Sequence, residues 1–232
     1  MNLIVGHTNM DLDCLGSMVL AKYLYPDHAL VKSRLVHPVA KNLENLYQNR
    51  LNFLNPKDLK GEHIGRMVIV DTRTFSRVKE YFQFIDNDDI EYEIYDHHPN
   101  DEISFKNASL HAMQCGSNTT QLGLELMQQG VQITAEDATI ALTGIYADTG
   151  NFTHENVVQA DFDVAGFLLK SGASLKLVKT FLKPLADKYQ ITLFHELLNR
   201  LEYRAIHGHQ LITSYWEIEN ETFEKAEISY VF

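Results

Sequence analysis

The chain has 232 residues, and its 20 basic and 31 acidic side chains give a formal net charge of −11. Apolar residues make up 45% and charged residues 22%, which is typical of a folded globular protein and excludes a disordered one. The acidic balance argues against a broad basic surface that would bind duplex nucleic acid. It leaves room for a small phosphate-bearing substrate, because bound divalent metals can supply local positive charge.

The sequence gives no sign of a membrane partner. The longest apolar runs, near residues 67–70 and 140–147, fall far short of the ~20 residues of a membrane-spanning helix. The N-terminus enters a predicted strand directly, without the basic region of a secretory signal. Only Cys14 and Cys115 are present, too few for a disulfide framework or a zinc ribbon, and both are expected to be buried packing residues. We therefore expect a reduced, cytoplasmic setting.

Over residues 1–150, β-prone runs alternate with helical patterns. This alternation predicts βαβ units and an α/β domain with a mostly parallel sheet flanked by helices. The predicted strands are 2–6, 29–35, 67–70 and 90–95, and the predicted helices are 15–25, 43–53, 118–129 and 135–147, with an irregular loop over 95–117.

Beyond Gly150 the pattern becomes helical, with predicted helices at 160–170, 174–182 and 188–206 and a strand at 210–218. We predict a first domain over residues 1–160, a helical linker over 161–207, and part of a smaller α/β domain over 208–232. The apolar run 228–232 fits either a terminal strand or a chain that ends inside a second domain.

Four acidic or histidine-rich segments lie where predicted strands or helices end. They contain His7, Asp11 and Asp13; Asp71; Asp96, His97 and His98; and Asp148. The carboxyl ends of parallel strands share one crevice, so the first three segments should converge. Clustered carboxylates are costly unless cations neutralise them. A pair of divalent metal ions is therefore the expected occupant.

Each segment also has a purely structural explanation. Asp11 and Asp13 suit a helix N-cap and first turn, Asp71 suits a turn, and Asp148 suits a helix C-terminal turn. The pair His97-His98 is harder to explain by packing. The occurrence of all four segments in this order favours a common site.

The four segments resemble the motifs of the DHH phosphoesterase superfamily, which is named for the motif present here as Asp96-His97-His98. Residues 7–13 match the family's histidine, spacer and Asp-x-Asp pattern, with Met10 in place of the usual proline. Asp71 and Asp148 match the second and fourth motifs, and residues 115–120 resemble a Gly-Ser-Thr segment that precedes a helix. The resemblance covers about residues 1–185.

Residues 148–153 are more similar to the branch of RecJ-like exonucleases, nanoRNases and phosphoadenosine-phosphate phosphatases than to the inorganic pyrophosphatases. The similarity is strongest to the N-terminal module that is fused to CBS and nucleotidyltransferase domains in some bacteria. Members of this branch continue into a substrate-grasping domain with a glycine-rich motif. This sequence has no Gly-Gly pair, so either the motif lies beyond residue 232 or the protein lacks it, and residues 208–232 are expected to be the beginning or remnant of such a domain.

The resemblance implies two divalent ions. One would be held by His7, Asp11 and Asp71, and the other by Asp13, Asp71, His97 and Asp148, with Asp71 bridging both. Oxygen and imidazole ligands without a thiolate suit Mn²⁺ or Mg²⁺, and the histidines favour Mn²⁺. His98 would contact the scissile phosphate and assist the leaving group, while Asp96 would orient an imidazole.

Other candidates have two interpretations each. Ser117, Asn118 and Thr119 suit either a phosphate at a helix N-terminus or plain N-capping, and Arg73 suits either a substrate phosphate or the protein surface. His154 and Asn156 either line the cleft or lie exposed in a loop, and Tyr215 and Trp216 either stack on a base or pack.

We therefore predict metal-dependent hydrolysis of phosphoester bonds in a short oligonucleotide or nucleotide phosphate by a water that two metals activate. The alternatives are a manganese-dependent inorganic pyrophosphatase or exopolyphosphatase, and a non-catalytic nucleotide- or RNA-binding module of a larger nucleotidyltransferase-type protein. The expected partner is the substrate, and a homo-oligomer is compatible with the sequence.

Overall fold

The computed structural model describes residues 1–99, 103–106, 108–182 and 188–215. The chain divides into two compact units, Met1–Leu182 and Lys183–Phe232. No helix in the described ranges is long and apolar enough to cross a membrane.

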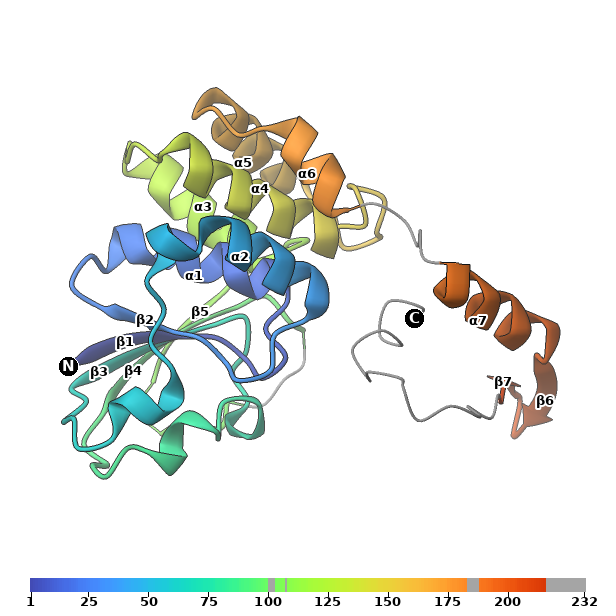
Figure 1. The fold of residues 1–232 in the computed structure, drawn as a ribbon, viewed down its shortest axis with the longest axis horizontal. Coiled ribbons are helices and arrows are strands. Elements are labelled where there is room, and N and C mark those ends of the chain that lie inside the picture. The colour runs from blue at the N-terminus through green and yellow to red at the C-terminus, as the bar shows by residue number, and fades with distance from the viewer. Residues whose placement is uncertain (100–102, 107, 183–187, 216–232) are drawn as a thin grey trace. The chain divides into compact units, whose positions relative to one another are not determined.

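A five-stranded parallel sheet forms the centre of the first unit (Figure 1). Its strands are β1 (Asn2–Val5), β2 (Ala29–Val31), β3 (Arg66–Val70), β4 (Glu91–Asp96) and β5 (Ser109–Ala112), in the order β2-β1-β3-β4-β5. The predicted α/β fold with a mostly parallel sheet is confirmed. The second strand ends earlier than expected, at Val31, and β5 lies inside the segment predicted to be irregular.

The six helices described in this unit lie on one face of the sheet in Figure 1. They are α1 (Leu12–Leu24), α2 (Pro38–Leu51), α3 (Asn118–Gln128), α4 (Ala135–Asp148), α5 (Gln159–Lys170) and α6 (Leu175–Phe181). The opposite face carries short 3-10 turns at Pro56–Leu59, Phe75–Arg77 and Tyr81–Gln83. Although α5 and α6 were predicted within a linker, they belong to the first unit, and Val164 of α5 is fully buried there.

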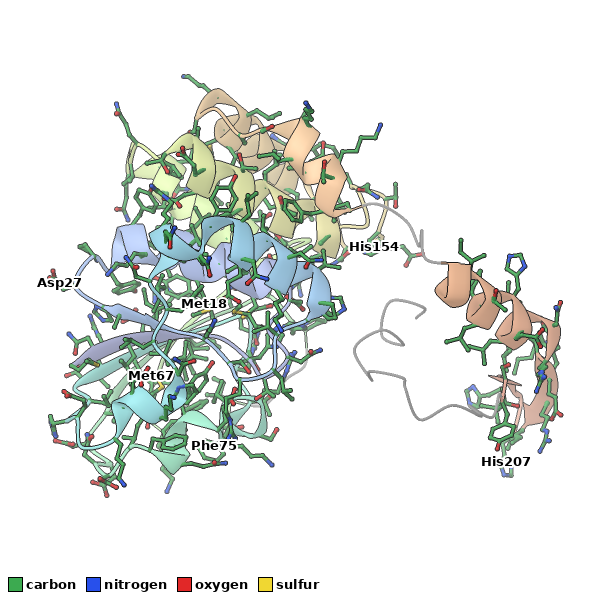
Figure 2. All side chains as sticks on the ribbon, in the orientation of Figure 1. Met18, Asp27, Met67, Phe75, His154 and His207 are labelled. Atoms are coloured by element: carbon green, nitrogen blue, oxygen red, sulfur yellow. The ribbon has the colours of Figure 1, made fainter. Side chains whose placement is uncertain are left out.

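Alternation along the strands builds two apolar cores. Ile4 and Val68 pack on the helical side, and Leu3 and Met67 pack on the side of the 3-10 turns, as the period-2 geometry of a strand requires. Figure 2 shows Met18 of α1 on the helical side and Met67 on the other side. Because both faces of the sheet are covered, a functional site is expected at the edge formed by the carboxyl ends of its strands.

Side-chain caps determine where α1 and α4 begin. The side chain of Asp11 accepts a hydrogen bond from the backbone N–H of Cys14 at 3.0 Å, so α1 starts at Leu12, three residues earlier than predicted. Thr134 caps α4, and its side chain accepts a hydrogen bond from the N–H of Asp137. The Asp11 cap places the start of α1, with its acidic residues, beside His7 after β1.

The second unit contains α7 (Lys188–Asn199) and an antiparallel hairpin of β6 (Glu202–Ile206) and β7 (His209–Thr213). The predicted helix over 188–206 is wrong after Asn199. Residues 202–206 form β6 instead, because they pair with β7 across a turn at His207 and Gly208, whose φ angles are 49° and 84°. The predicted strand at 210–218 is present as β7 up to Thr213, and its residues 216–218 lie outside the described residues. Trp216 and the run 228–232 lie outside the described residues.

Candidate metal centre

Three neighbouring strands deliver the predicted ligands to one edge of the sheet. His7 follows β1, Asp71 follows β3, and β4 ends at Asp96, directly before His97. The register places Val5 beside Ile69 and Ile69 beside Ile94, so these strands end next to each other. Asp148 reaches the same place as the last residue of α4.

Asp71 and two neighbours form the first half of the centre. Nε2 of His7 lies 3.2 Å from Oδ2 of Asp71 and 3.5 Å from Oδ2 of Asp11. Nδ1 of His7 donates to the carbonyl of Thr8 at 3.0 Å, which orients the ring so that Nε2 faces the carboxylates. Asp71 has a φ angle of 62°, a left-handed conformation that is costly for a residue with a side chain and typical of functional sites.

The second half of the centre gathers around His97. Its Nε2 lies 3.3 Å from Oδ2 of Asp148, 3.5 Å from Oδ1 of Asp71 and 3.8 Å from Oδ2 of Asp13. Its Nδ1 donates to the carbonyl of Cys115 at 3.1 Å. The two oxygens of Asp71 therefore face different imidazoles, Oδ2 toward His7 and Oδ1 toward His97.

The donor atoms fit a metal centre because several of them are buried without a hydrogen-bond partner. Nε2 of His7 and Oδ1 of Asp71 make no hydrogen bond, although their residues are 2% and 3% exposed. Buried polar atoms normally find a partner, and a cation among these atoms would provide one. Carboxylates and imidazoles suit divalent ions of the Mg²⁺ and Mn²⁺ type.

The pKa values in the metal-free protein show the same crowding of charge. Burial and the charge of Asp71 raise the pKa of Asp13 to about 7, and burial together with Asp13 and Asp71 raises that of Asp148 to about 8. Burial lowers the pKa of His97, but the surrounding carboxylates outweigh it and raise the value to about 10. The pKa of His7 rises to about 10 for the same reason. Without cations, the centre is therefore neutralised by protons.

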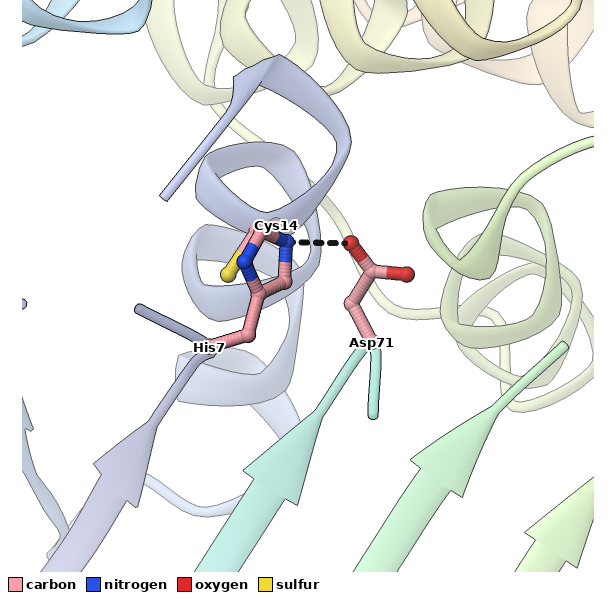
Figure 3. Close-up of side chains that lie close together, drawn as sticks. All are labelled: His7, Cys14 and Asp71. Atoms are coloured by element: carbon pink, nitrogen blue, oxygen red, sulfur yellow. Dashed lines mark ion pairs between the residues drawn. The ribbon is translucent and has the colours of Figure 1, made fainter. Parts of the chain in front are cut away.

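Cys14 lies closer to this centre than the sequence indicated. Its sulfur and one donor atom each of His7 and Asp71 lie within 4.8 Å of one another, and the thiol is fully buried. Figure 3 shows the three side chains together. The sequence pattern predicts only a packing role for Cys14, since nothing in a helical pattern shows which way its side chain points. Burial raises the pKa of this thiol well above its usual range.

His98 and Asp96 form a hydrogen-bonded pair beside the centre. Nδ1 of His98 donates to Oδ1 of Asp96 at 2.7 Å, and Nε of Arg73 donates to Oδ2 of the same carboxylate at 2.6 Å. Asp96 is fully buried and Arg73 is 9% exposed, so the interpretation of Arg73 as a surface residue is wrong. Nη2 of Arg73 also donates to the carbonyl of His98 at 2.8 Å. The predicted contact of Arg73 with a substrate phosphate stays a prediction.

The N-terminus of α3 binds a carboxylate of this chain. The backbone N–H groups of Asn118 and Thr119 donate to Asp13 at 2.7 and 3.0 Å. The side chain of Ser117 accepts from the N–H of Thr120 at 3.1 Å, so its interpretation as an N-cap is confirmed. All three predicted phosphate-binding residues are fully buried. Their role at a substrate stays a prediction, because these two amides are already engaged by Asp13.

A cleft of about 580 Å³ adjoins the centre. His97, His98 and Asp148 line it together with Gln114, His154 and Asn156. Nδ1 of His154 donates to the carbonyl of Asp148 at 2.9 Å. Gly150 permits this contact, since a Cβ there would lie 2.2 Å from the ring of His154 and its φ is 53°. His154, labelled in Figure 2, and Asn156 thus both line the cleft and lie exposed in a loop.

The sequence profile of the DHH family N-terminal domain matches residues 2–145. The chain belongs to the DHH family, a class whose parallel sheet and clustered His and Asp ligands match the site described above. It is 32% identical over 235 residues to the A-adding tRNA nucleotidyltransferase of Geobacter sulfurreducens, a match that covers 100% of this chain and 26% of the relative. The chain therefore spans about a quarter of the length of this curated relative.

Two solved structures share the fold. An exopolyphosphatase-related protein from Bacteroides fragilis is 19% identical with a TM-score of 0.65, and the match covers 87% of this chain and 61% of that one. A Methanococcus jannaschii protein described as a candidate family II inorganic pyrophosphatase is 17% identical with a TM-score of 0.60, covering 99% and 75%. At these identities the similarity concerns the fold alone.

Proposed function

We propose that this chain hydrolyses phosphoester bonds in short oligonucleotides or nucleotide phosphates, with two divalent metal ions, Mn²⁺ or Mg²⁺, as cofactors. The observation that carries the proposal is the position of Asp71. One of its oxygens lies 3.2 Å from His7 and the other lies 3.5 Å from His97, at the carboxyl edge of the sheet. A carboxylate between two sets of ligands is the arrangement that a two-metal hydrolase needs.

The ligands divide between two ions that share Asp71. His7 and Asp11 complete one set, and Asp13, His97 and Asp148 complete the other. When bound, such a pair of ions lowers the pKa of a water molecule and neutralises charge on a phosphate. The chain supplies the preorganisation, because Asp13 is held by two backbone amides and both imidazoles are oriented through their Nδ1 atoms.

His98 is the residue we assign to the leaving group. The hydrogen bond to Asp96 raises the pKa of His98, while burial opposes the rise, so a proton on Nε2 is favoured. His98 lines the cleft. As the water oxygen forms its bond to phosphorus and the bond to the leaving oxygen breaks, Nε2 donates its proton to that leaving oxygen. The proton that the attacking water loses passes to solvent, from which His98 is protonated again. Asp96 stays a carboxylate throughout and holds the ring in place.

The lining of the cleft supports a phosphodiester over inorganic polyphosphates. Among the described residues that line it, the polar groups are imidazoles, the amides of Gln114 and Asn156, and the acids Asp148 and Glu155, without a lysine or arginine. A densely charged polyphosphate needs such cations, whereas an oligonucleotide carries one charge per phosphate and offers sugar and base groups to amides. The name of the Geobacter sulfurreducens relative, an A-adding tRNA nucleotidyltransferase, also supports a nucleotide substrate.

The experiment is Mn²⁺-dependent hydrolysis of a labelled RNA dinucleotide, with Asp71→Ala protein as the blank and pyrophosphate as a parallel substrate. We expect mononucleotides from the wild type alone. Release of phosphate from pyrophosphate without cleavage of the dinucleotide would favour a pyrophosphatase. If neither substrate is cleaved although metal binds, a non-catalytic nucleotide-binding module becomes the better explanation.

A further inference from the structure

Asp161 is a fully buried carboxylate outside the four motifs. It is the third residue of α5, and its two oxygens accept hydrogen bonds from three groups. The backbone N–H of Gly116 donates to Oδ1 and Oδ2 at 3.1 and 3.0 Å, the hydroxyl of Thr120 donates to Oδ1 at 2.6 Å, and the N–H of Val158 donates to Oδ2 at 2.8 Å. Asp161 therefore joins the start of α5 to residues 116–120.

Residues 115–120, which we call the support segment, contact two ligands assigned to the same metal ion. The carbonyl of Cys115 accepts from Nδ1 of His97 at 3.1 Å. The N–H groups of Asn118 and Thr119 hold both carboxylate oxygens of Asp13. Asp161 holds the support segment at Gly116 and Thr120, on either side of these amides.

The other metal position has separate supports. Nδ1 of His7 donates to the carbonyl of Thr8, and Asp11 accepts from the N–H of Cys14. Neither of these hydrogen bonds involves the support segment. A disturbance at Asp161 should therefore reach the two metal positions unequally.

We propose that Asp161 is a positioning residue for the metal ion held by Asp13, His97, Asp71 and Asp148, and that it acts through the support segment. The inference rests on the two-metal function proposed above. The hydrogen bonds of Asp161 go to Gly116, Thr120 and Val158 and to none of these four described residues. It orients the carbonyl that holds His97 and the amides that hold Asp13.

Gly116 shows how closely the support segment approaches Asp161. A Cβ at this position would lie 2.6 Å from Cγ2 of Thr149 and 2.9 Å from Oδ2 of Asp161. Only glycine lets the backbone N–H come this close to the carboxylate. Gly116→Ala should therefore disturb the same ligands as a change at Asp161, while Gly166→Ala is its control, because a Cβ at Gly166 meets no atom within 4 Å.

The test is a titration with Mn²⁺, monitored by calorimetry and by electron paramagnetic resonance. Together these methods give the number of bound ions and the affinity of each. We expect wild type to bind two ions. Asp161→Ala should keep one ion at wild-type affinity and bind the other about 10- to 100-fold more weakly, the usual cost of losing a partner that orients a ligand. Asp161→Asn should lose less affinity for that ion, since its amide oxygen still accepts hydrogen bonds from Gly116 and Val158 while its NH₂ group donates to Thr120.

Asp137→Ala is the matched control. Asp137 is also buried, at 6% exposure, but it accepts hydrogen bonds from Arg50 and Tyr23 rather than from the support segment. The Asp137→Ala protein should unfold at a lower temperature than wild type and bind both ions with wild-type affinity. If Asp161→Ala does not fold, Asp161→Asn and Gly116→Ala decide the question by the same titration.

Equal weakening of both ions, or wild-type affinity at both in Asp161→Asn and Gly116→Ala, would overturn the role of Asp161. A weakened ion in the Asp137→Ala control would also overturn it, because the effect would then follow from lost stability. By contrast, fewer than two ions in the wild type would count against the proposed two-metal function itself.

Discussion

Nδ1 of His98 lies 2.7 Å from Oδ1 of Asp96. Since Asp96 is fully buried and His98 borders the cleft, the carboxylate holds one side of the ring and leaves Nε2 for a substrate. We propose that this pair keeps His98 available for proton transfer, although its Nδ1 also lies 3.9 Å from Oδ1 of Asp71. His97, the neighbouring residue, faces the metal centre, whereas His98 serves the leaving group in our proposal.

His98→Ala should slow turnover of a dinucleotide and leave the number of bound ions unchanged. Loss of a general acid typically costs about 10²- to 10⁴-fold in rate. Single-turnover kinetics and a Mn²⁺ titration on the same protein measure the two effects. Loss of an ion in this variant would show that His98 is a ligand instead.

Arg73→Lys distinguishes a support for Asp96 from a substrate contact. The guanidinium donates to the side chain of Asp96 and to the carbonyl of His98 at 2.6 and 2.8 Å, a fork that an ammonium group cannot reproduce. We expect kcat to fall with KM nearly unchanged. A raised KM with an unchanged kcat would instead place Arg73 on a substrate phosphate, as the sequence-based prediction has it.

Metal binding should release protons. The pKa values of His7 and His97 are raised to about 10 in the metal-free protein, so both rings are doubly protonated at neutral pH. A cation must displace the proton on Nε2 of each ring. The apparent affinity for Mn²⁺ should therefore rise with pH. Calorimetry at pH 7 in two buffers with different protonation enthalpies should give different heats. Identical heats would mean that no proton leaves.

The metal-free protein should become less stable as pH rises from about 6.5 to about 10. Folding raises the pKa values of His7 and His97 from 6.5 to about 10, so the folded state holds more protons than the unfolded chain in this window. Asp13 and Asp148 act in the same direction at lower pH, with values raised from 3.8 to about 7 and about 8.

Thermal unfolding with a chelator present measures this dependence. The midpoint should fall as the pH rises, and saturating Mn²⁺ should remove most of the fall, because cations then take over the role of the protons. A midpoint that rises between pH 6.5 and pH 10 without metal would show that the cluster does not bind protons as described.

The sequence predicts which residues gather at the candidate centre because the His and Asp residues lie where predicted strands and helices begin or end. Each ligand follows an apolar run or starts or ends a helix, and parallel strands place such residues at one edge. The continuous apolar runs of β1 and β3 likewise predict strands of a parallel sheet that is covered on both faces. β5 was missed because its four residues, including Ser109 and His111, form a polar edge strand without an apolar pattern.

The supports of the centre could not be predicted in the same way. Asp161 looks like an ordinary helix-start acid, and its bond to Gly116 joins residues 45 positions apart. Arg73 looks like a surface residue until its carboxylate partner 23 positions away is placed beside it. Such contacts depend on tertiary packing rather than on local spacing. The sequence therefore indicated which His and Asp residues cluster, and it did not indicate the groups that hold them.

The most direct test of the account is the number of Mn²⁺ ions bound by wild type and by Asp71→Ala, with Asp137→Ala as the folded control. We predict two ions for the wild type and the control. For Asp71→Ala, both ions should weaken by more than the ~100-fold that loss of an outer partner costs, because one carboxylate faces both sets of ligands. An Asp71→Ala protein that keeps either ion at wild-type affinity would contradict the bridging centre.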